Sequence, residues 1–239
     1  MDKSTTEQDL WKSIWERKGN EVSEKIELAE LIAIDGFDTG AGNFSVNSWL
    51  TFVKEIQVRL NIKGKILEVG CGAGAFLYPL YNADINIFGI DYSSSLVDIC
   101  SRIMPSGIFK VAEANILPFE DLFFDAIVSN SVFQYFESLT YAENVINEMA
   151  RTLKSTGNIA LLDINDASKK QEYELIRRAK LGDDDYYRLY GSLTHQFYRK
   201  EWFENIANHL NFKCVIENQN IIGYDNSRFR YNVFLSRED

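Results

Sequence analysis

Hydrophobic positions in the middle of the chain alternate between short apolar runs and longer amphipathic segments. The short runs are rich in β-branched residues, which is typical of buried strands. The segments between them have apolar residues at helical spacing. We predict strands near residues 65–69, 86–90, 107–112, 124–129 and 157–163. Strands that alternate with helices predict a parallel sheet covered by helices on both faces.

The two ends of the chain extend this pattern. Residues 1–60 are predicted to be helical, with one helix from about Asn47 to Leu60. Near the other end, a helix at 199–210 precedes two apolar runs, Phe212 to Glu217 and Tyr231 to Leu235. We predict that these two runs form a closing hairpin.

A glycine-rich turn follows the first predicted strand. Residues 66–74 read Ile-Leu-Glu-Val-Gly-Cys-Gly-Ala-Gly, with glycine at 70, 72 and 74. Glycine lets the backbone approach a ligand closely and adopt a positive φ. Helical spacing over Ala75 to Tyr81 predicts a helix whose first N–H groups are unpaired. The turn is therefore a candidate binding site.

The acidic residues around this turn discriminate between two cofactor classes. Gly70, Gly72 and Ala75 satisfy a loose G-x-G-x-x-G/A, which leaves a nicotinamide or flavin dinucleotide open. However, Glu68 lies two residues before the first glycine, and a carboxylate there would repel a pyrophosphate. It would suit S-adenosylmethionine, which carries an ammonium and a sulfonium. Asp91 ends the next strand and can accept hydrogen bonds from both ribose hydroxyls.

Three further segments carry a resemblance to a known family. They are Val111-Ala-Glu-Ala-Asn-Ile-Leu-Pro-Phe119, the run from Phe124 to Phe136, and the run from Glu148 to Asp163. In this order after the glycine turn, they resemble the class I S-adenosylmethionine-dependent methyltransferases, over residues 64–164. The resemblance implies a Rossmann-like α/β fold: a seven-stranded mixed sheet with its last strand antiparallel, flanked by helices.

The resemblance also implies roles for residues around the cofactor. Gly70, Gly72 and Gly74 would border its methionine part, with Glu68 nearby. Asp91 would hold the ribose hydroxyls.

Further roles follow for residues at the next strand ends. Tyr92 would lie beside the ribose. Glu113, where the family often has Asp, would contact the adenine amino group, and Ala114 would offer its backbone N–H to the ring. Asn130 and Ser131 would face both the methionine moiety and the acceptor. A second departure, Ser155-Thr156-Gly157 in place of Pro-Gly-Gly, changes only a turn.

The length of 239 residues favours one methyltransferase domain, 1–239. Within it we expect an N-terminal helical cap (1–60), a cofactor-binding core (61–164), an acceptor lid (165–198) and a C-terminal helix and hairpin (199–239). The lid is longer than a crossover needs and rich in aromatic residues, which favours acceptor binding over the alternative of a helix packed on the sheet.

Candidate acceptor-binding residues lie in the lid and just before the last strand. Tyr187 and Tyr190 are predicted to contact the acceptor, and Arg228 to neutralise an anionic group on it. Salt bridging to the acidic surface is the alternative for Arg228. His195 is the candidate catalytic base, with a substrate hydrogen bond or simple packing as alternatives.

Composition excludes several classes of protein. The net charge of −10 weighs against nucleic acid as a partner. No stretch is apolar enough for a membrane span, and the N-terminus lacks a signal-peptide pattern. Three cysteines without metal spacing and only two histidines predict no metal site and favour a reducing cytoplasm. The oligomeric state cannot be predicted.

We therefore expect a cytoplasmic methyltransferase that O-methylates a small polar metabolite. The pattern His-Gln-Phe-Tyr, an amphipathic helix and Asn-Phe-Lys is similar to bacterial methyltransferases that decorate surface saccharides, which favours a sugar or nucleotide-activated acceptor. An N-methyltransferase acting on a small amine, an NAD(P)-dependent oxidoreductase and a non-catalytic cofactor-binding protein stay open as alternatives.

Overall fold

A seven-stranded sheet forms the centre of the computed structural model, which describes residues 6–20, 26–37, 45–81, 85–182 and 195–237. The strands are β1 (Lys65–Val69), β2 (Asn86–Asp91), β3 (Ile108–Val111), β4 (Phe124–Asn130), β5 (Leu153–Asn165), β6 (Phe212–Asn218) and β7 (Arg230–Arg237). Their order across the sheet is β3-β2-β1-β4-β5-β7-β6.

The strand directions confirm the predicted mixed sheet. Neighbours from β3 to β5 pair in parallel, whereas β7 is antiparallel to both β5 and β6. The chain leaves β1 toward β2 and β3 on one side and returns to β4 and β5 on the other. Ligands of such sheets bind at the carboxyl ends of the strands where the order reverses. Here that point is the end of β1.

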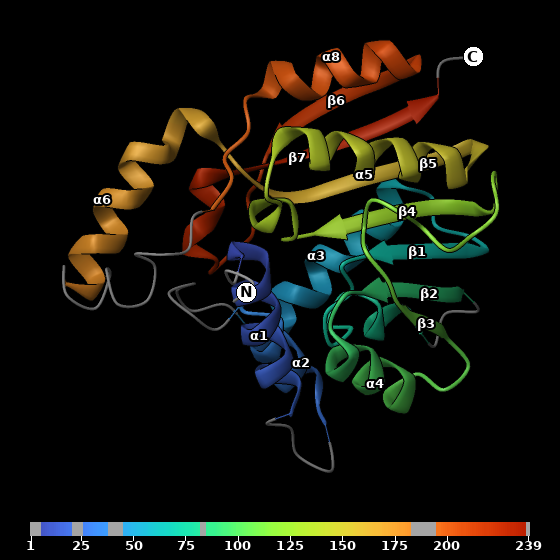
Figure 1. The fold of residues 1–239 in the computed structure, drawn as a ribbon, viewed down its shortest axis with the longest axis horizontal. Coiled ribbons are helices and arrows are strands. Elements are labelled where there is room, and N and C mark those ends of the chain that lie inside the picture. Colours follow the sequence, from blue (N-terminus) through green and yellow to red (C-terminus); the bar gives the residue numbers. More distant parts are fainter. Residues whose placement is uncertain (1–5, 21–25, 38–44, 82–84, 183–194, 238–239) are drawn as a thin grey trace, which may run out of the picture.

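Helices cover both faces of the sheet (Figure 1). The helices are α1 (Glu7–Asn20), α2 (Leu28–Ile34), α3 (Val46–Arg59), α4 (Ser94–Ile103), α5 (Leu139–Thr152), α6 (Lys170–Leu181) and α8 (Lys200–Leu210). Buried side chains of α2, α3 and α4 share one hydrophobic core with the sheet, and those of α5 and α8 share the other.

The predicted N-terminal helices lie at the carboxyl edge of the sheet. In Figure 1 the arrows of β1, β2 and β4 point to the side where α1, α2 and α6 lie. Glu16 of α1 accepts hydrogen bonds from the backbone N–H groups of Ser94 (2.8 Å) and Ser95 (3.2 Å), which are unpaired donors at the start of α4. This contact holds α1 over the strand ends.

The helix predicted over Ala75 to Tyr81 is wrong. The segment consists of turns and a short 3₁₀-helix, Tyr78–Leu80. Pro79 within this segment has no backbone N–H to donate to a preceding turn. The glycine turn therefore owes its geometry to tertiary contacts rather than to a long helix that follows it.

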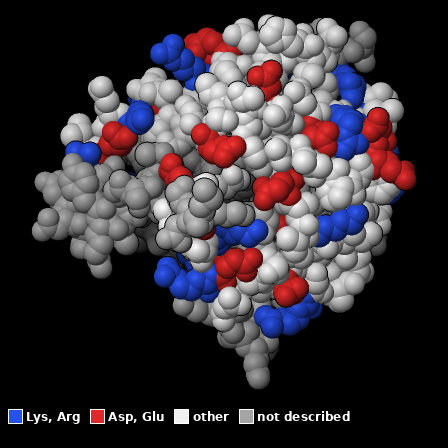
Figure 2. All heavy atoms as spheres, in the orientation of Figure 1, with Lys and Arg blue, Asp and Glu red and all other residues white. Residues whose placement is uncertain are grey.

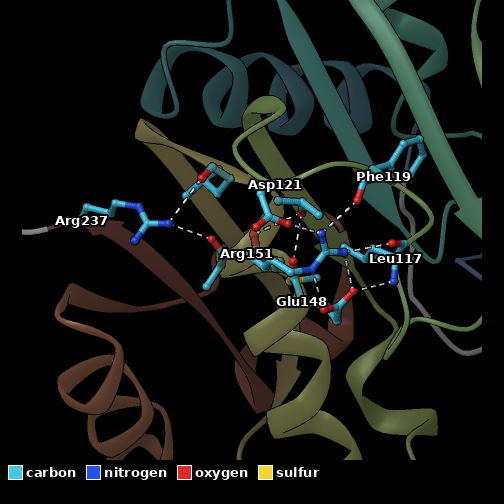
Figure 3. A network of polar contacts seen from close by, with 10 residues as sticks. Leu117, Phe119, Asp121, Glu148, Arg151 and Arg237 are labelled. Carbon is cyan, nitrogen blue, oxygen red and sulfur yellow. Dashed lines mark hydrogen bonds and ion pairs between the residues drawn. The ribbon is translucent and has the colours of Figure 1, made fainter.

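A half-buried arginine stabilises the loop between β3 and β4. Arg151 of α5 donates to the backbone oxygens of Leu117 and Phe119 (3.0 Å each), to Glu148 (2.7 and 2.8 Å) and to Asp121 (2.6 Å). Figure 3 shows the guanidinium between these acceptors. Hydrogen bonds from Arg151 raise its own pKa and lower that of Glu148.

We predict that Arg151→Met lowers the free energy of unfolding by about 2 kcal/mol, because two carbonyls and two carboxylates lose a charged donor. Urea denaturation would measure the loss. Arg102→Met is the matched control: Arg102 is exposed on α4, and its substitution should change stability by less than about 0.5 kcal/mol. Equal effects of the two variants would contradict a special role for Arg151.

Candidate active site

An acidic pocket lies at the carboxyl ends of β1, β2 and β4. We give it this name because the carboxylates of Asp35, Glu68, Asp91 and Glu113 line it. Trp11 and Trp15 of α1 close it from the N-terminal side. The predicted cofactor site and part of the N-terminal helical region thus meet in one cavity.

Tertiary contacts hold the glycine turn against β2. The N–H groups of Gly70 and Cys71 both donate to the carbonyl of Ile90, at 2.9 and 2.8 Å. Gly72 has φ +51, and a Cβ built on it would overlap the carboxylate of Asp35. Gly70 and Gly72 line the acidic pocket, whereas Gly74 does not: it lies behind the turn, against Met104 and Cys100.

Asp91 joins the turn to the second strand. Its carboxylate accepts from the backbone N–H groups of Gly72 (3.0 Å) and Ser93 (2.9 Å). Burial raises the pKa of Asp91 to about 6, although these N–H groups favour the charged form. A ligand with hydroxyl donors or a positive charge would favour the ionised carboxylate further.

Glu68 is the one of these four carboxylates with a buried oxygen that has no hydrogen-bond partner among the described residues. Its side chain is 3% exposed, and the unpartnered oxygen is Oε2. Burial, with the nearby charges of Asp35 and Asp91, raises the pKa of Glu68 well above its usual range. Such a group is costly unless a ligand supplies a compensating charge or donor. The pocket therefore favours a cationic ligand.

Asp35 was missed by sequence reasoning. It ends α2, and its two carboxylate oxygens accept from the N–H groups of Ala73 (2.6 Å) and Ala75 (3.1 Å). Burial raises its pKa to about 7. The Asp35-Gly36 pair indicates only a turn, and nothing local links it to a loop 38 positions further along.

The remaining predicted cofactor residues lie around the same pocket. Tyr92, Glu113, Ala114, Asn130 and Ser131 all line it. Glu113 accepts a hydrogen bond from a tyrosine of α5 at 3.1 Å, and the buried Oδ1 of Asn130 has no partner among the described residues. Tyr187 and Tyr190 lie outside the described residues.

A second cavity, of about 190 Å³, adjoins the acidic pocket. We call it the basic pocket because Arg177, Lys180, Arg228 and Arg230 line it. Both cavities share Ser131 and Tyr135 as lining residues. A molecule in the basic pocket would therefore lie next to one in the acidic pocket.

His195 lies in the basic pocket, close to the boundary between the two cavities. Its ring stacks on Trp11, which lines the acidic pocket, with centroids 5.3 Å apart. Nδ1 of His195 lies 3.1 Å from Nη1 of Arg177 and accepts its hydrogen bond. Burial, with the charges of Arg177 and Arg230, lowers the pKa of His195 to about 3, so the ring is neutral near pH 7. Whether it acts as a base stays a prediction.

The chain is similar in sequence to known methyltransferases. Residues 67–161 match a family described as a methyltransferase domain. The chain is 30% identical over 145 residues to the demethylmenaquinone methyltransferase of Thermotoga maritima, covering 60% of this chain and 58% of that protein. It is 34% identical over 96 residues to "Probable tRNA methyltransferase 9B" of Bos taurus, covering 40% and 20%. The chain thus spans less than two thirds of either relative.

A solved structure extends the likeness to the whole fold. The magnesium protoporphyrin IX methyltransferase of Synechocystis PCC 6803, with bound S-adenosylhomocysteine, has a TM-score of 0.61 at 13% identity and covers 97% of this chain and 95% of that one. Residues 67–161 match this methyltransferase-domain family, and the chain has the fold of the class I S-adenosylmethionine-dependent methyltransferases. The family match and the fold agree with the predicted cofactor, S-adenosylmethionine.

The described residues suit that cofactor. Its ammonium and sulfonium would offset the unpartnered oxygen of Glu68 and the crowded charges of Asp35 and Asp91. Within the described ranges, no group of three or more His, Cys, Asp or Glu could hold a metal ion. Among the described helices, none combines the length and apolar character needed to cross a membrane.

We predict that S-adenosylmethionine binds at least tenfold more weakly at about pH 5.5 than at about pH 7.5. Asp35 and Asp91 have pKa values raised to about 7 and about 6, so acid protonates them in the free protein. A cationic ligand binds their ionised forms, and binding releases protons. Calorimetry in two buffers with different heats of ionisation measures both effects. A pH-independent affinity without proton release would refute this linkage.

Proposed function

We propose that the chain transfers the methyl group of S-adenosylmethionine to an oxygen of a small polar metabolite, a sugar or a nucleotide-activated molecule. The observation that carries the proposal is the pair of adjoining pockets. The acidic pocket suits a cationic methyl donor, and the basic pocket shares Ser131 and Tyr135 with it. An acceptor in the second pocket would lie next to the donor.

The chemistry required of the protein is mainly positioning. S-adenosylmethionine supplies an electrophilic methyl group for an in-line displacement by the acceptor. Holding an oxygen about 3–3.5 Å from that methyl, on its axis, can lower the barrier by several kcal/mol. The closed walls formed by Trp11 and Tyr135 would exclude competing water from the boundary between the pockets.

The alternatives have less support from the two pockets. A dinucleotide would bring a pyrophosphate to the turn beside Glu68 and Asp91, where it would be repelled. A protonated amine acceptor would meet the cations of the basic pocket. A non-catalytic cofactor-binding protein would have no use for a second pocket that adjoins the first.

We propose that the acceptor is a small molecule rather than nucleic acid, although one relative is named for tRNA. The net charge of −10 supports this. On the face drawn in Figure 2, Lys and Arg side chains are scattered among Asp and Glu. The small volume of the basic pocket also favours a compact acceptor. Three cysteines, which cannot all pair, support a reducing cytoplasm.

Transfer of labelled methyl groups would test the proposal. The protein would be incubated with methyl-labelled S-adenosylmethionine and matched sets of sugars, sugar nucleotides and small amines. We expect label in O-methyl products. Label only in N-methyl products would establish the amine alternative, and cofactor binding without any transfer would leave a non-catalytic binding protein.

We propose that His195 contacts the acceptor, as base or as hydrogen-bond partner. His195→Ala should lower turnover by tenfold or more and change the affinity for S-adenosylhomocysteine by less than twofold, since the ring lines the basic pocket alone. A solvent deuterium isotope effect on turnover separates the two roles, because only a base takes up the acceptor's proton during the transfer. Wild-type turnover in the variant would remove both.

A further inference from the structure

The basic pocket concentrates positive charge in an acidic chain. Four cationic side chains line it, while Asp225 is the only carboxylate among its described lining residues. Lys180 lies 3.5 Å from Asp225, at the exposed rim. The guanidinium groups of Arg177, Arg228 and Arg230 line the same cavity. The proposed function does not say which of these cations meets the acceptor.

Arg230 is the deepest of these cations. It begins β7, is 6% exposed, and lines the basic pocket. Its Nε and Nη1 are buried without a hydrogen-bond partner among the described residues. Nε lies 3.4 Å from Oδ1 of Asp163, an ion pair too long for a strong hydrogen bond. A buried guanidinium with unused N–H groups is costly unless a ligand accepts from them.

Asp163 cannot supply what Arg230 lacks, because other donors already engage it. Its oxygens accept from the hydroxyl of Ser131 (2.8 Å), the amide of Gln219 (2.9 Å) and the hydroxyl of Tyr224 (3.1 Å). These bonds fix the carboxylate behind the pocket. Arg230 is therefore oriented by Asp163, while its Nη1 has no hydrogen-bond acceptor among the described residues.

We propose that the methyl acceptor carries an oxyanion, a phosphate or a carboxylate, which Arg230 binds in the basic pocket. The planar guanidinium presents parallel N–H groups that match two oxygens of such a group. Ser131 and Tyr135 line both pockets, so they lie between this anion and the methyl donor. The nucleophilic oxygen of the acceptor therefore lies at the end of the molecule opposite its charged group. The proposal rests on the proposed function, since it treats this cavity as the acceptor site.

Nuclear magnetic resonance of the arginine Nε–H groups tests the site in the wild-type protein. Protein saturated with S-adenosylhomocysteine would be titrated separately with inorganic phosphate and with acetate, at constant ionic strength. We expect a saturable shift of the Arg230 resonance with at least one anion. Arg59, which pairs with Glu217 at 2.8 Å and does not line the pocket, is the control. A response no larger at Arg230 than at Arg59 would overturn the proposal.

Paired acceptors test the same claim by kinetics. Acceptors would differ in one group only: a neutral sugar, its phosphate and its uronic acid. For wild-type protein we expect KM at least tenfold lower for a charged member, and the more active member identifies phosphate or carboxylate. Arg230→Met should abolish this preference, Arg228→Gln should reduce it at the exposed rim, and Arg59→Met should leave it intact.

The outcomes separate this inference from the proposed function. Methyl transfer with no preference for charged acceptors overturns the oxyanion site and leaves the methyltransferase standing. Saturable anion binding at Arg230 without transfer to any acceptor supports the site and refutes the activity. If Arg230→Met does not fold, the resonance titration of the wild-type protein and the Arg228→Gln kinetics still decide.

Discussion

Asp91→Ala is expected to weaken the binding of S-adenosylmethionine at least tenfold, equivalent to about 1.4 kcal/mol or more. The variant removes a buried carboxylate placed to accept hydrogen bonds from the ribose. It also removes the acceptor for the N–H of Gly72, 3.0 Å away, so the glycine turn loses one of its ties to β2. Calorimetric titration with S-adenosylhomocysteine measures the same contact without the sulfonium charge.

Asp98→Ala provides the matched control for this prediction. Asp98 is an exposed carboxylate on the neighbouring helix α4, so its loss changes the net charge by the same amount. We expect its affinity for both ligands to stay within twofold of wild type. Comparable losses in the two variants would mean that overall charge, rather than the contact at the strand end, governs binding.

The fold and the core of the cofactor pocket were predictable because both depend on local patterns. Short apolar runs define β1, β2 and β4, and residues that directly follow such runs in parallel strands meet at one edge of the sheet. Glu68, Asp91 and Asn130 could therefore be placed in one pocket from their positions in the sequence.

The parts that sequence reasoning missed depend on long-range contacts. Asp35 belongs to the pocket because α2 packs against the turn, and its partners lie in a different part of the chain. From the sequence, either Arg228 or Arg230 could neutralise an anionic group on the acceptor, and Arg228 was chosen, because alternation along a strand does not reveal which side chain enters a cavity. The depth of Arg230 follows from the network around Asp163, which joins β4, β5 and β7.

Gly72→Ala is expected to combine two effects, backbone strain and a steric clash. The residue has φ +51, and the added Cβ would overlap Asp35. We expect the free energy of unfolding to fall by about 3 kcal/mol, of which strain in the left-handed region accounts for about 1–2 kcal/mol. Cofactor affinity should also fall at least tenfold, because Gly72 lines the pocket and donates to Asp91. Denaturation and calorimetric titration measure the two losses.

A double-mutant cycle separates the clash from the strain. Gly182→Ala also places alanine at a positive φ, +78, but no atom lies within 4 Å of its Cβ, so it should show backbone strain without a clash. Asp35→Ala removes the carboxylate that the new methyl group would meet. In the double variant we expect Asp35→Ala and Gly72→Ala to destabilise by less than the sum of their separate effects, since the overlap no longer exists. Strict additivity would show that the carboxylate of Asp35 does not occupy the space beside Gly72.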